Sequence, residues 1–415
     1  MIVNQEKTLA EKVRADFPIL QRKVNGKPLV YFDNAESSQK PSVVLNALQD
    51  YYEQYNSNVH QSTHVLGKEA TEAYEAAREK LAKFVNAASP QEIIYTRNAT
   101  EGINLVAYDW GINNLTRGDE IIISVMEHHS NIVPWQVVAQ KTGAVLKFVE
   151  LNENEEFNLE QFKTLISDKT KLVSVLHLSS TLGCVNPVAE IIAIARQKGS
   201  KVLIDTCQSL PHMPIDVQKM DCDWLVGSGY KMCGPTGIGL LYGKSDLLRS
   251  MPPFLTGGDM VAEVYRDRAT YKDLPYKFEA GTPSIADAIA FGAAVDYLSE
   301  IGMDKIYAYE TELTKYLVKQ LQQIPSIRIY GPQPENAAVG KVAIVMFTVG
   351  DIPAKDLSSR LDQAGIAINA GLQATQPLHQ YLGVESTARA SLYFYNTYSE
   401  IDAFIAAIKE TIDNS

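Results

Sequence analysis

The sequence predicts an α/β protein built on a mostly parallel sheet, because two kinds of segment alternate along it. Short apolar or β-branched runs of strand length recur up to residue 243, and amphipathic stretches of helical period lie between several of them. This alternation is typical of βαβ units, in which helices cover both faces of a parallel sheet. The runs that we expect to form strands are 92–96, 120–125, 144–150, 171–178, 201–205, 223–227 and 237–243.

The helices of this sheet are expected at 41–55, 100–113 and 188–198, and a long helical region follows at 284–324. Beyond it the pattern changes to strands near 327–331, 341–348 and 390–394, with helices near 354–364 and 398–411. We therefore expect a large domain over residues 30–290 and a smaller α+β domain made of residues 1–29 and 291–415. The amphipathic stretch Leu9–Phe17 should pack on the smaller domain, since it cannot stand alone.

The charge balance argues against nucleic acid as the main ligand. The chain of 415 residues carries 38 Lys+Arg against 49 Asp+Glu, a formal net charge of -11, and its pI is near 5.2. Phosphate backbones are held by basic surfaces, which have the opposite sign. With 46% hydrophobic and 21% charged residues, the composition is that of a globular protein large enough for two or three domains.

The sequence indicates neither export nor membrane insertion. Its four cysteines, Cys184, Cys207, Cys222 and Cys233, are too few and too irregularly spaced for a disulfide framework, and no two form a zinc-type CxxC pair. We expect a reducing compartment and no metal site. The first residues carry charges where a signal peptide needs an apolar run, and no uncharged apolar stretch reaches membrane-spanning length. We therefore expect a cytoplasmic protein that contacts no membrane.

The sharpest chemical signal is a carboxylate and a lysine that each follow a predicted strand. Asp205 closes the strand 201–205, and Lys231 comes 26 residues later, just beyond the strand 223–227. Ligands bind at the carboxyl ends of strands in such sheets. A lysine amine kept neutral there can form a Schiff base. A lysine in a surface turn and an aspartate that caps a loop would give the same pattern.

Pyridoxal phosphate uses such a pair, and the sequence offers other groups of the right chemistry for it. Thr100 begins a predicted helix, where its hydroxyl and the free backbone N–H groups favour an anion. His128 follows another strand and could cover the cofactor ring, and Arg389 could fork onto a substrate carboxylate. Gln208 and Ser228 could reach the ring oxygen and the phosphate. Each residue alone also has an ordinary explanation as a helix cap, a polar contact or a surface ion pair.

Together and in this order, these residues resemble the class V aminotransferase family of fold type I pyridoxal-phosphate enzymes, above all its group II cysteine desulfurases. The resemblance runs from about Phe17 to the carboxyl terminus. It is carried by the segments VYFDNAESSQKP, NVHQSTHVLG, ATEGINLVA, MEHHSNIVPW, STLGCVNP, GSGYKMCGPTGIGLLYG, KFEAGTPS and RASLYFYNT. It implies pyridoxal phosphate as cofactor, an amino acid as substrate, a seven-stranded large domain and a homodimer with shared active sites.

The resemblance also implies roles for matching positions. Lys231 matches the lysine that bonds the cofactor, Asp205 the partner of its pyridine nitrogen, and His128 the residue stacked on its ring. Once substrate displaces Lys231, the free amine is the natural base at the α carbon, so Lys231 and His128 are the catalytic candidates. The other cofactor-binding candidates are Gln208 at the ring hydroxyl, Thr100 and Ser228 at the phosphate, Thr282 at the phosphate from the second subunit, and Ala99, Ser180 and Tyr230. The substrate-binding candidates are Arg389 at the carboxylate, with Ala35, Glu36, His60, Gln61, Asn369 and Ala374.

The chain departs from the family pattern in the loop that carries the desulfurase nucleophile. Desulfurases of this group have a glycine, two histidines and then the cysteine shortly before the arginine of RASL, whereas residues 371–374 here read GLQA. The cysteine position is Ala374, and no cysteine follows Cys233. Persulfide chemistry requires a thiolate, which a methyl group cannot replace. Cys207 and Cys233 are expected on the cofactor side of the pocket, and we do not expect either to act as the nucleophile.

Other positions around the expected substrate entrance have changed as well. Gln61 and Asn369 replace arginines of the family pattern, Glu36 an alanine, Tyr230 a histidine and Ser180 an asparagine. Two cations are thus lost and one anion is gained, while Lys231, Asp205 and Arg389 are intact. This combination favours a repurposed enzyme over a relic that only binds the cofactor.

Three hypotheses about function follow. The first is a carbon-sulfur lyase that acts on cysteine, cystine or an S-substituted cysteine by β-elimination. The second is a specialised enzyme of amino-acid or secondary metabolism, performing transamination, epimerisation, decarboxylation or elimination, with Glu36 suited to a cationic side chain. The third is a non-catalytic, cofactor-binding partner of a true desulfurase. The sequence gives no support for docking of a sulfur-acceptor protein.

Overall fold

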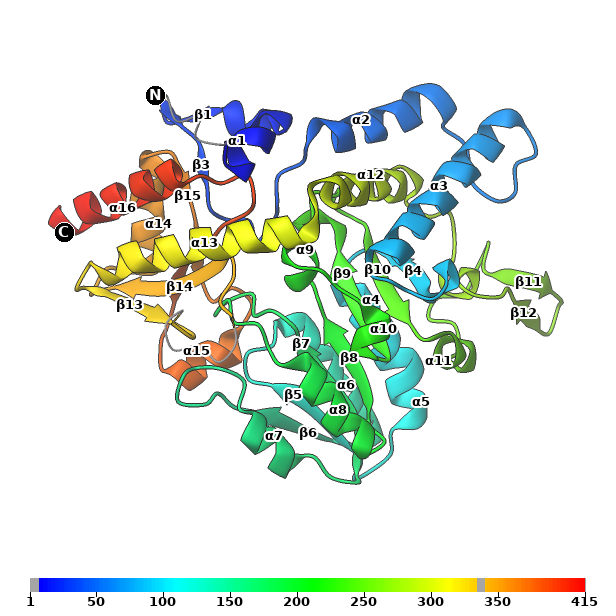
Figure 1. The fold of residues 1–415 in the computed structure, drawn as a ribbon. Coiled ribbons are helices and arrows are strands. Elements are labelled where there is room, and N and C mark those ends of the chain that lie inside the picture. The colour runs from blue at the N-terminus through cyan, green and yellow to red at the C-terminus, as the bar shows by residue number, and fades with distance from the viewer. Residues whose placement is uncertain (1–6, 334–339, 415) are drawn as a thin grey trace.

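A seven-stranded sheet forms the centre of the computed structural model, which describes residues 7–333 and 340–414 (Figure 1). Strand β10 pairs antiparallel with β4 and β9, and the other neighbours pair in parallel. In sheet order the strands are β4 (Ile93–Thr96), β10 (Gly239–Gly243), β9 (Trp224–Ser228), β8 (Lys201–Asp205), β7 (Thr170–Leu176), β5 (Glu120–Ser124) and β6 (Val145–Val149). All seven predicted runs are strands of this sheet, so the predicted fold class is confirmed.

Both faces of the sheet are buried, which explains why its strands are continuous apolar runs. Ile122 and Ile204 belong to one hydrophobic cluster, whereas their neighbours Ile121 and Leu203 belong to another. Successive side chains of a strand point to opposite faces, so the two clusters lie on the two sides of the sheet. Residues of α3 (Val65–Phe84), α8 (Val188–Gln197) and α12 (Ile285–Ile301) complete the first cluster, and residues of α4 (Ala99–Leu105) and α6 (Val133–Thr142) the second.

A second sheet of four strands builds the C-terminal part of the chain. Its order is β13 (Ile327–Tyr330), β14 (Ile344–Val349), β17 (Thr387–Ser391) and β16 (Asn369–Gly371), all antiparallel. The helices α13 (Met303–Gln322), α14 (Ala354–Gln363) and α16 (Tyr398–Asp413) share a hydrophobic cluster with it. The predicted division into residues 30–290 and the remainder stays a prediction.

The N-terminal segment lies beside this C-terminal part, as Figure 1 shows for α1 (Leu9–Val13) and α16. The ring of Phe17 contacts that of Tyr395, with 4.6 Å between centroids. Arg14 forms an ion pair with Glu400 at 2.8 Å. The parallel pair of β3 (Val30–Tyr31) and β15 (Ile366–Ala367) also joins the two ends of the chain.

The remaining helices and strands are short. They are α2 (Ser42–Asp50), α5 (Ile112–Asn114), α7 (Leu159–Leu165), α9 (Ser209–His212), α10 (Val217–Met220), α11 (Ser245–Ser250), α15 (Gln376–Leu382), β1 (Lys23–Val24), β2 (Lys27–Pro28), β11 (Val261–Val264) and β12 (Ala269–Tyr271). No helix among the described residues is long and apolar enough to span a membrane.

Several boundaries differ from the sequence prediction, and two of the differences have a clear physical reason. The helical region 284–324 is interrupted at Gly302, whose φ of +94° is unfavourable for other residues and separates α12 from α13. The strand expected near 390–394 is β17, which ends at Ser391. Tyr393 and Phe394 are buried by packing beyond the end of the strand, so their apolar character was mistaken for extended backbone.

Candidate functional site

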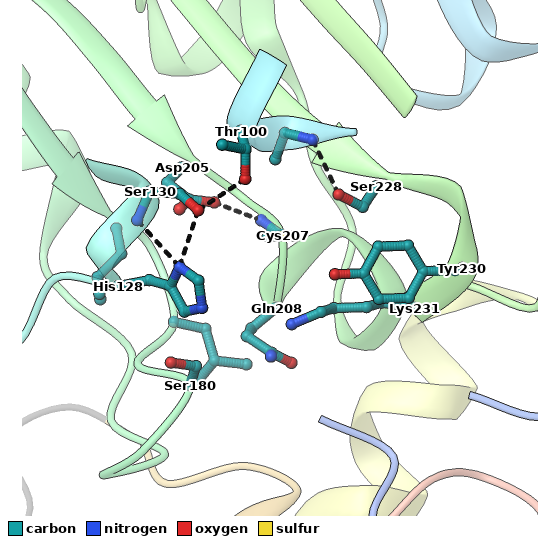
Figure 2. A pocket seen from close by; sticks show the side chains of 13 residues that line it. Thr100, His128, Ser130, Ser180, Asp205, Cys207, Gln208, Ser228, Tyr230 and Lys231 are labelled. Atoms are coloured by element: carbon teal, nitrogen blue, oxygen red, sulfur yellow. Dashed lines mark hydrogen bonds between the residues drawn. The ribbon is translucent and has the colours of Figure 1, made fainter. Parts of the chain in front are cut away.

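Five chain segments meet at one edge of the seven-stranded sheet and line a cleft with an empty volume of about 430 Å³. Each segment follows the carboxyl end of a strand, and these ends coincide because β4, β5, β7, β8 and β9 run in the same direction. Such an edge is the usual ligand position in open α/β sheets. The candidates that line the cleft are Ala99, Thr100, His128, Ser180, Asp205, Gln208, Ser228, Tyr230 and Lys231 (Figure 2).

Asp205 lines this cleft and is only 6% exposed. Its Oδ1 accepts a hydrogen bond of 2.9 Å from the backbone N–H of Cys207. Burial raises the pKa of the Asp205 carboxyl. A buried carboxylate needs a partner to remain charged, and a protonated ring nitrogen would be such a partner.

Glu127 is a second buried carboxyl near Asp205, and sequence reasoning missed it. It receives hydrogen bonds from Ser124 Oγ at 2.5 Å and from Asn131 Nδ2 at 2.8 Å. Burial, with a smaller contribution from the charge of Asp205, raises the pKa of Glu127 to about 8. At neutral pH this side chain is therefore mostly protonated, which limits repulsion of Asp205.

Lys231 closes a single helical turn, Gly229–Lys231, after β9 and is 7% exposed. No hydrogen bond or ion pair of its amine is found among the described residues, and the side chain points into the cleft in Figure 2. The turn is tightly packed, because a Cβ at Gly234 would come within 2.9 Å of the carbonyl oxygen of Gly229. Lys40 Nζ donates to the carbonyl of Tyr230 at 2.7 Å and so holds the backbone just before Lys231.

His128 is held by Ser130, a further residue that the sequence analysis did not single out. The backbone N–H of Ser130 donates to His128 Nδ1 at 3.1 Å, so this nitrogen is the acceptor and Nε2 carries the hydrogen. Burial and then the charge of Lys231 lower the pKa of His128 to about 4, so the ring is neutral at pH 7. Ser130 Oγ also lies 2.7 Å from Thr100 Oγ1. The only sequence signal for Ser130 was its position two residues after His128.

The polar atoms of the cleft fit a bound polar ligand such as pyridoxal phosphate. Ser180 Oγ and Gln208 Oε1 are buried and have no hydrogen-bond partner among the described residues. Buried polar groups are rarely left unpaired, so unpartnered atoms in a cleft indicate a ligand. Ser228 Oγ accepts from the backbone N–H of Ala99 at 2.9 Å, which joins two segments expected at the phosphate. The residues present therefore suit the cofactor.

Arg389 lies beside the cleft in a group that we call the rim cluster, which consists of Asp33, Glu36, Asn369 and Arg389. The guanidinium is buried, and its Nη2 contacts Asp33 Oδ1 at 3.4 Å and Glu36 Oε2 at 3.2 Å. Its Nη1 donates to the carbonyl of Ser180 at 3.0 Å, which connects the cluster to the cleft. Asn369 Nδ2 lies 3.5 Å from Asp33 Oδ2.

Ala35 and Ala374 contact residues near the cleft through their backbone carbonyls. The carbonyl of Ala35 accepts from Gln208 Nε2 at 2.8 Å, and that of Ala374 accepts from the N–H of His129 at 2.8 Å. The Ala374 loop is held by further contacts. Thr375 Oγ1 lies 3.0 Å from Thr181 Oγ1, and His129 Nε2 accepts from the N–H of Gln376 at 3.0 Å.

Three candidates do not join the cleft within one chain. Thr282 lines a second cleft, together with Tyr74 of α3. His60 Nε2 lies within hydrogen-bond distance of Glu75 Oε1, at 2.8 Å, and the centroid of its ring lies 5.7 Å from that of Tyr74. Gln61 is exposed and hydrogen-bonds Asp259. We call Thr282, His60 and Gln61 the α3-side group.

The comparisons with known proteins agree with this geometry. The model of the family described as aminotransferase class-V matches residues 30–404. The chain belongs to the class V aminotransferase family. It is a pyridoxal phosphate-dependent enzyme, and the relatives and solved structures that it resembles include proteins named cysteine desulfurases.

A probable cysteine desulfurase of Synechocystis sp. is 60% identical over 99% of this chain and 98% of its own length. The crystal structure of the cysteine desulfurase CsdA from Escherichia coli, in an S-sulfonic acid form, has a TM-score of 0.90 and 37% identity over 97% of this chain and 98% of its own. An apo cysteine desulfurase from Thermococcus onnurineus has a TM-score of 0.93 and 33% identity over 99% and 100% of the two chains.

Proposed function

We propose that this enzyme is a carbon-sulfur lyase that cleaves cysteine, cystine or an S-substituted cysteine by β-elimination. The proposal is supported by a cleft whose residues suit pyridoxal phosphate, beside a loop that bears Ala374 where the sequence resemblance puts the nucleophilic cysteine. A lyase of this kind needs a base and an electron sink but no protein thiol. The loss of the thiol therefore removes persulfide transfer and leaves elimination available.

The remaining cysteines support this interpretation because none of them is an exposed thiol in the cleft. Cys233 is fully buried, and burial raises the pKa of its thiol to about 12. Cys207 borders the cleft, and burial raises the pKa of its thiol as well. The thiolate is the nucleophilic form, so both groups are poorly suited to attack sulfur at neutral pH.

Pyridoxal phosphate would be held by residues of the cleft. Lys231 would bond its aldehyde carbon, Asp205 would pair with its ring nitrogen, and the neutral ring of His128 would stack on it. The hydroxyls of Thr100 and Ser228 would hold its phosphate, while Gln208 and Ser180 would gain partners for their unpaired oxygens. When bound, the cofactor supplies an electron sink for the α carbon of an amino acid.

The chain's own residues then bind the substrate and move its proton. Arg389, whose Nε is buried without a partner among the described residues, would hold the substrate carboxylate. The Lys231 amine would take the α proton. With L-cysteine the carbon-sulfur bond breaks with its electron pair on sulfur, giving sulfide and 2-aminoacrylate. Water then converts 2-aminoacrylate to pyruvate and ammonia, so no external oxidant or reductant is needed.

The test is to mix the cofactor-loaded enzyme with L-cysteine, L-cystine and S-methyl-L-cysteine without added thiol and to identify the products by mass spectrometry. We expect pyruvate and ammonia in equal amounts, with sulfide, a persulfide or a thiol as the third product. Lys231→Ala is the inactive control. Alanine together with a protein-bound persulfide would contradict the proposal, and so would the absence of pyruvate from all three substrates.

A second candidate function is favoured by the charges of the rim cluster. Asp33 and Glu36 both contact Arg389, and Gln61 and Asn369 supply no positive charge. An amino acid with a second cationic group would suit this surrounding. A reaction confined to such amino acids, with no pyruvate from L-cysteine, would favour this candidate.

We further propose that the enzyme is a homodimer in which the α3-side group completes the cleft of the second subunit. The proposal is supported by the position of Thr282, which lines a cleft separate from that of Lys231 within the chain's own fold. Mixing Lys231→Ala with Thr282→Val subunits should restore part of the activity that each variant lacks, because one cleft of the mixed dimer is intact. A monomer by light scattering, or no restoration in proven mixed dimers, would contradict it.

A further inference from the structure

The contact between Glu36 and Arg389 joins an exposed side chain to a buried one. Glu36 is 62% exposed, whereas Arg389 is 2% exposed. Glu36 Oε2 lies 3.2 Å from Arg389 Nη2, and the two residues are 353 positions apart in the sequence. A carboxylate is thus already present on the guanidinium that we assign to the substrate carboxylate.

The charges around Arg389 mean that the contact with Glu36 affects the binding of a carboxylate. Asp33 alone would balance the guanidinium, and its Oδ1 lies 3.4 Å from the same Nη2. With Glu36 added, the three side chains carry one net negative charge when both carboxyls are ionised. The positive charge of Arg389 is therefore already compensated when the substrate carboxylate arrives. If Glu36 stays in place, its carboxylate also repels that of the substrate.

Glu36 is also able to leave. Its side chain is largely in solvent, and no other hydrogen bond or ion pair of its carboxylate is found among the described residues. The backbone before it is fixed, since Ala35 is fully buried and its N–H donates to Ser391 Oγ at 2.8 Å. Rotation of one side chain would therefore remove the Glu36 carboxylate from Nη2 without moving the backbone, and Asp33 would remain in contact with this nitrogen.

We propose that Glu36 is an internal competitor, whose carboxylate occupies Arg389 until the carboxylate of the substrate replaces it. The inference rests on the proposed role of Arg389 and adds a specificity-determining residue to it. Its consequence is that carboxylate ligands bind more weakly than Arg389 alone would allow. Some amino acids carry a second cationic group that can pair with the displaced Glu36. These amino acids should regain the binding affinity that the competition removes.

The experiment compares L-alanine with ethylamine, which both bring an amine, whereas only L-alanine brings a carboxylate. Their dissociation constants are measured by calorimetry and by the absorbance of the cofactor-loaded enzyme, for the wild type, Glu36→Gln and Glu36→Ala. We expect both variants to bind L-alanine about fivefold more tightly and ethylamine unchanged, as an ion pair between an exposed and a buried group predicts. L-2,3-diaminopropionate should lose its advantage over L-alanine in both variants.

Two further variants distinguish a failure of the proposed competition by Glu36 from a failure of the proposed role of Arg389. Glu385→Gln removes the same charge from an exposed position just before β17 and should leave all three constants unchanged. Arg389→Met should abolish the advantage of L-alanine over ethylamine. If Arg389→Met has no such effect, the proposed role of Arg389 is wrong. If it has that effect but the Glu36 variants bind L-alanine as the wild type does, only the competition is wrong, whatever the outcome of the elimination assay.

Discussion

The cleft and the rim cluster lie next to each other, but different kinds of interaction hold their residues. In the cleft, Asp205 and Lys231 are almost completely buried and are positioned by the ends of central strands. In the rim cluster, Glu36 and Asn369 are at least partly exposed and come from segments far apart in the sequence. The cleft holds residues that suit pyridoxal phosphate, and the rim cluster holds two of the three changed charges, at Glu36 and Asn369. We therefore expect cofactor binding and substrate choice to depend on separable sets of residues.

The largest expected effect is that of Lys231→Ala, which tests the cleft side of this comparison. Loss of the proposed base should reduce elimination by about 10³-fold or more. The variant should also release the cofactor on gel filtration. The rate of pyruvate formation and the cofactor absorbance of the eluted protein measure the two effects. Lys163→Ala, in the exposed part of α7, is the control, and an active Lys231→Ala enzyme would refute the assignment.

Asp205→Asn should have the next largest effect, about 100-fold on the rate, because an amide keeps the shape but not the charge beside the ring nitrogen. The amide oxygen can still accept from the N–H of Cys207. We therefore expect the variant to fold and to bind the cofactor, which thermal unfolding and absorbance spectra check. A rate equal to that of the wild type would separate Asp205 from the chemistry.

The cleft side should also be sensitive to acid through His177, whose backbone N–H donates to the backbone carbonyl of Asp205 at 2.9 Å. Burial lowers the pKa of His177 from 6.5 to about 4. The unfolded chain therefore binds this proton at a higher pH than the folded one, and stability present above pH 6.5 is lost as the pH falls toward 4. The expected loss between pH 6.5 and 5 is about 2 kcal/mol.

Urea unfolding of the wild type and of His177→Phe across this pH range measures the effect. Each protein is compared with its own stability at pH 7, so a uniform destabilisation by the phenyl ring does not matter. We expect a shallower decline in the variant. Parallel curves would show that His177 titrates normally.

The smallest effect is expected for Thr375→Val, which tests the loop on the rim side. The substitution leaves the buried hydroxyl of Thr181 without its partner and should cost about 1 kcal/mol. Faster hydrogen exchange at residues 371–377, with little change at β8, would show that the loop is held locally. Uniform exchange throughout the protein would instead show that the two regions unfold together.

The sequence predicted the central sheet well because strands buried on both faces carry continuous apolar runs, as β5 and β8 do. Short strands gave no such signal. Both β11 and β12 are mostly exposed, and β15 has only two residues. The cleft residues were predictable because each follows a strand. The contact between Glu36 and Arg389 could not be predicted from the sequence, because it forms only when the two ends of the chain meet in the fold.

The contrast between Ala35 and Glu36 has an evolutionary consequence. Ala35 is fully buried, and any larger side chain there would have to displace packed neighbours. Glu36, one residue later, extends into solvent, so a change from a small neutral residue to an acid at this position costs the fold almost nothing. One substitution can therefore alter the charge beside Arg389 while the rest of the protein remains the same. Selection for a new substrate can act here without first rescuing stability, and overall sequence identity barely records the event.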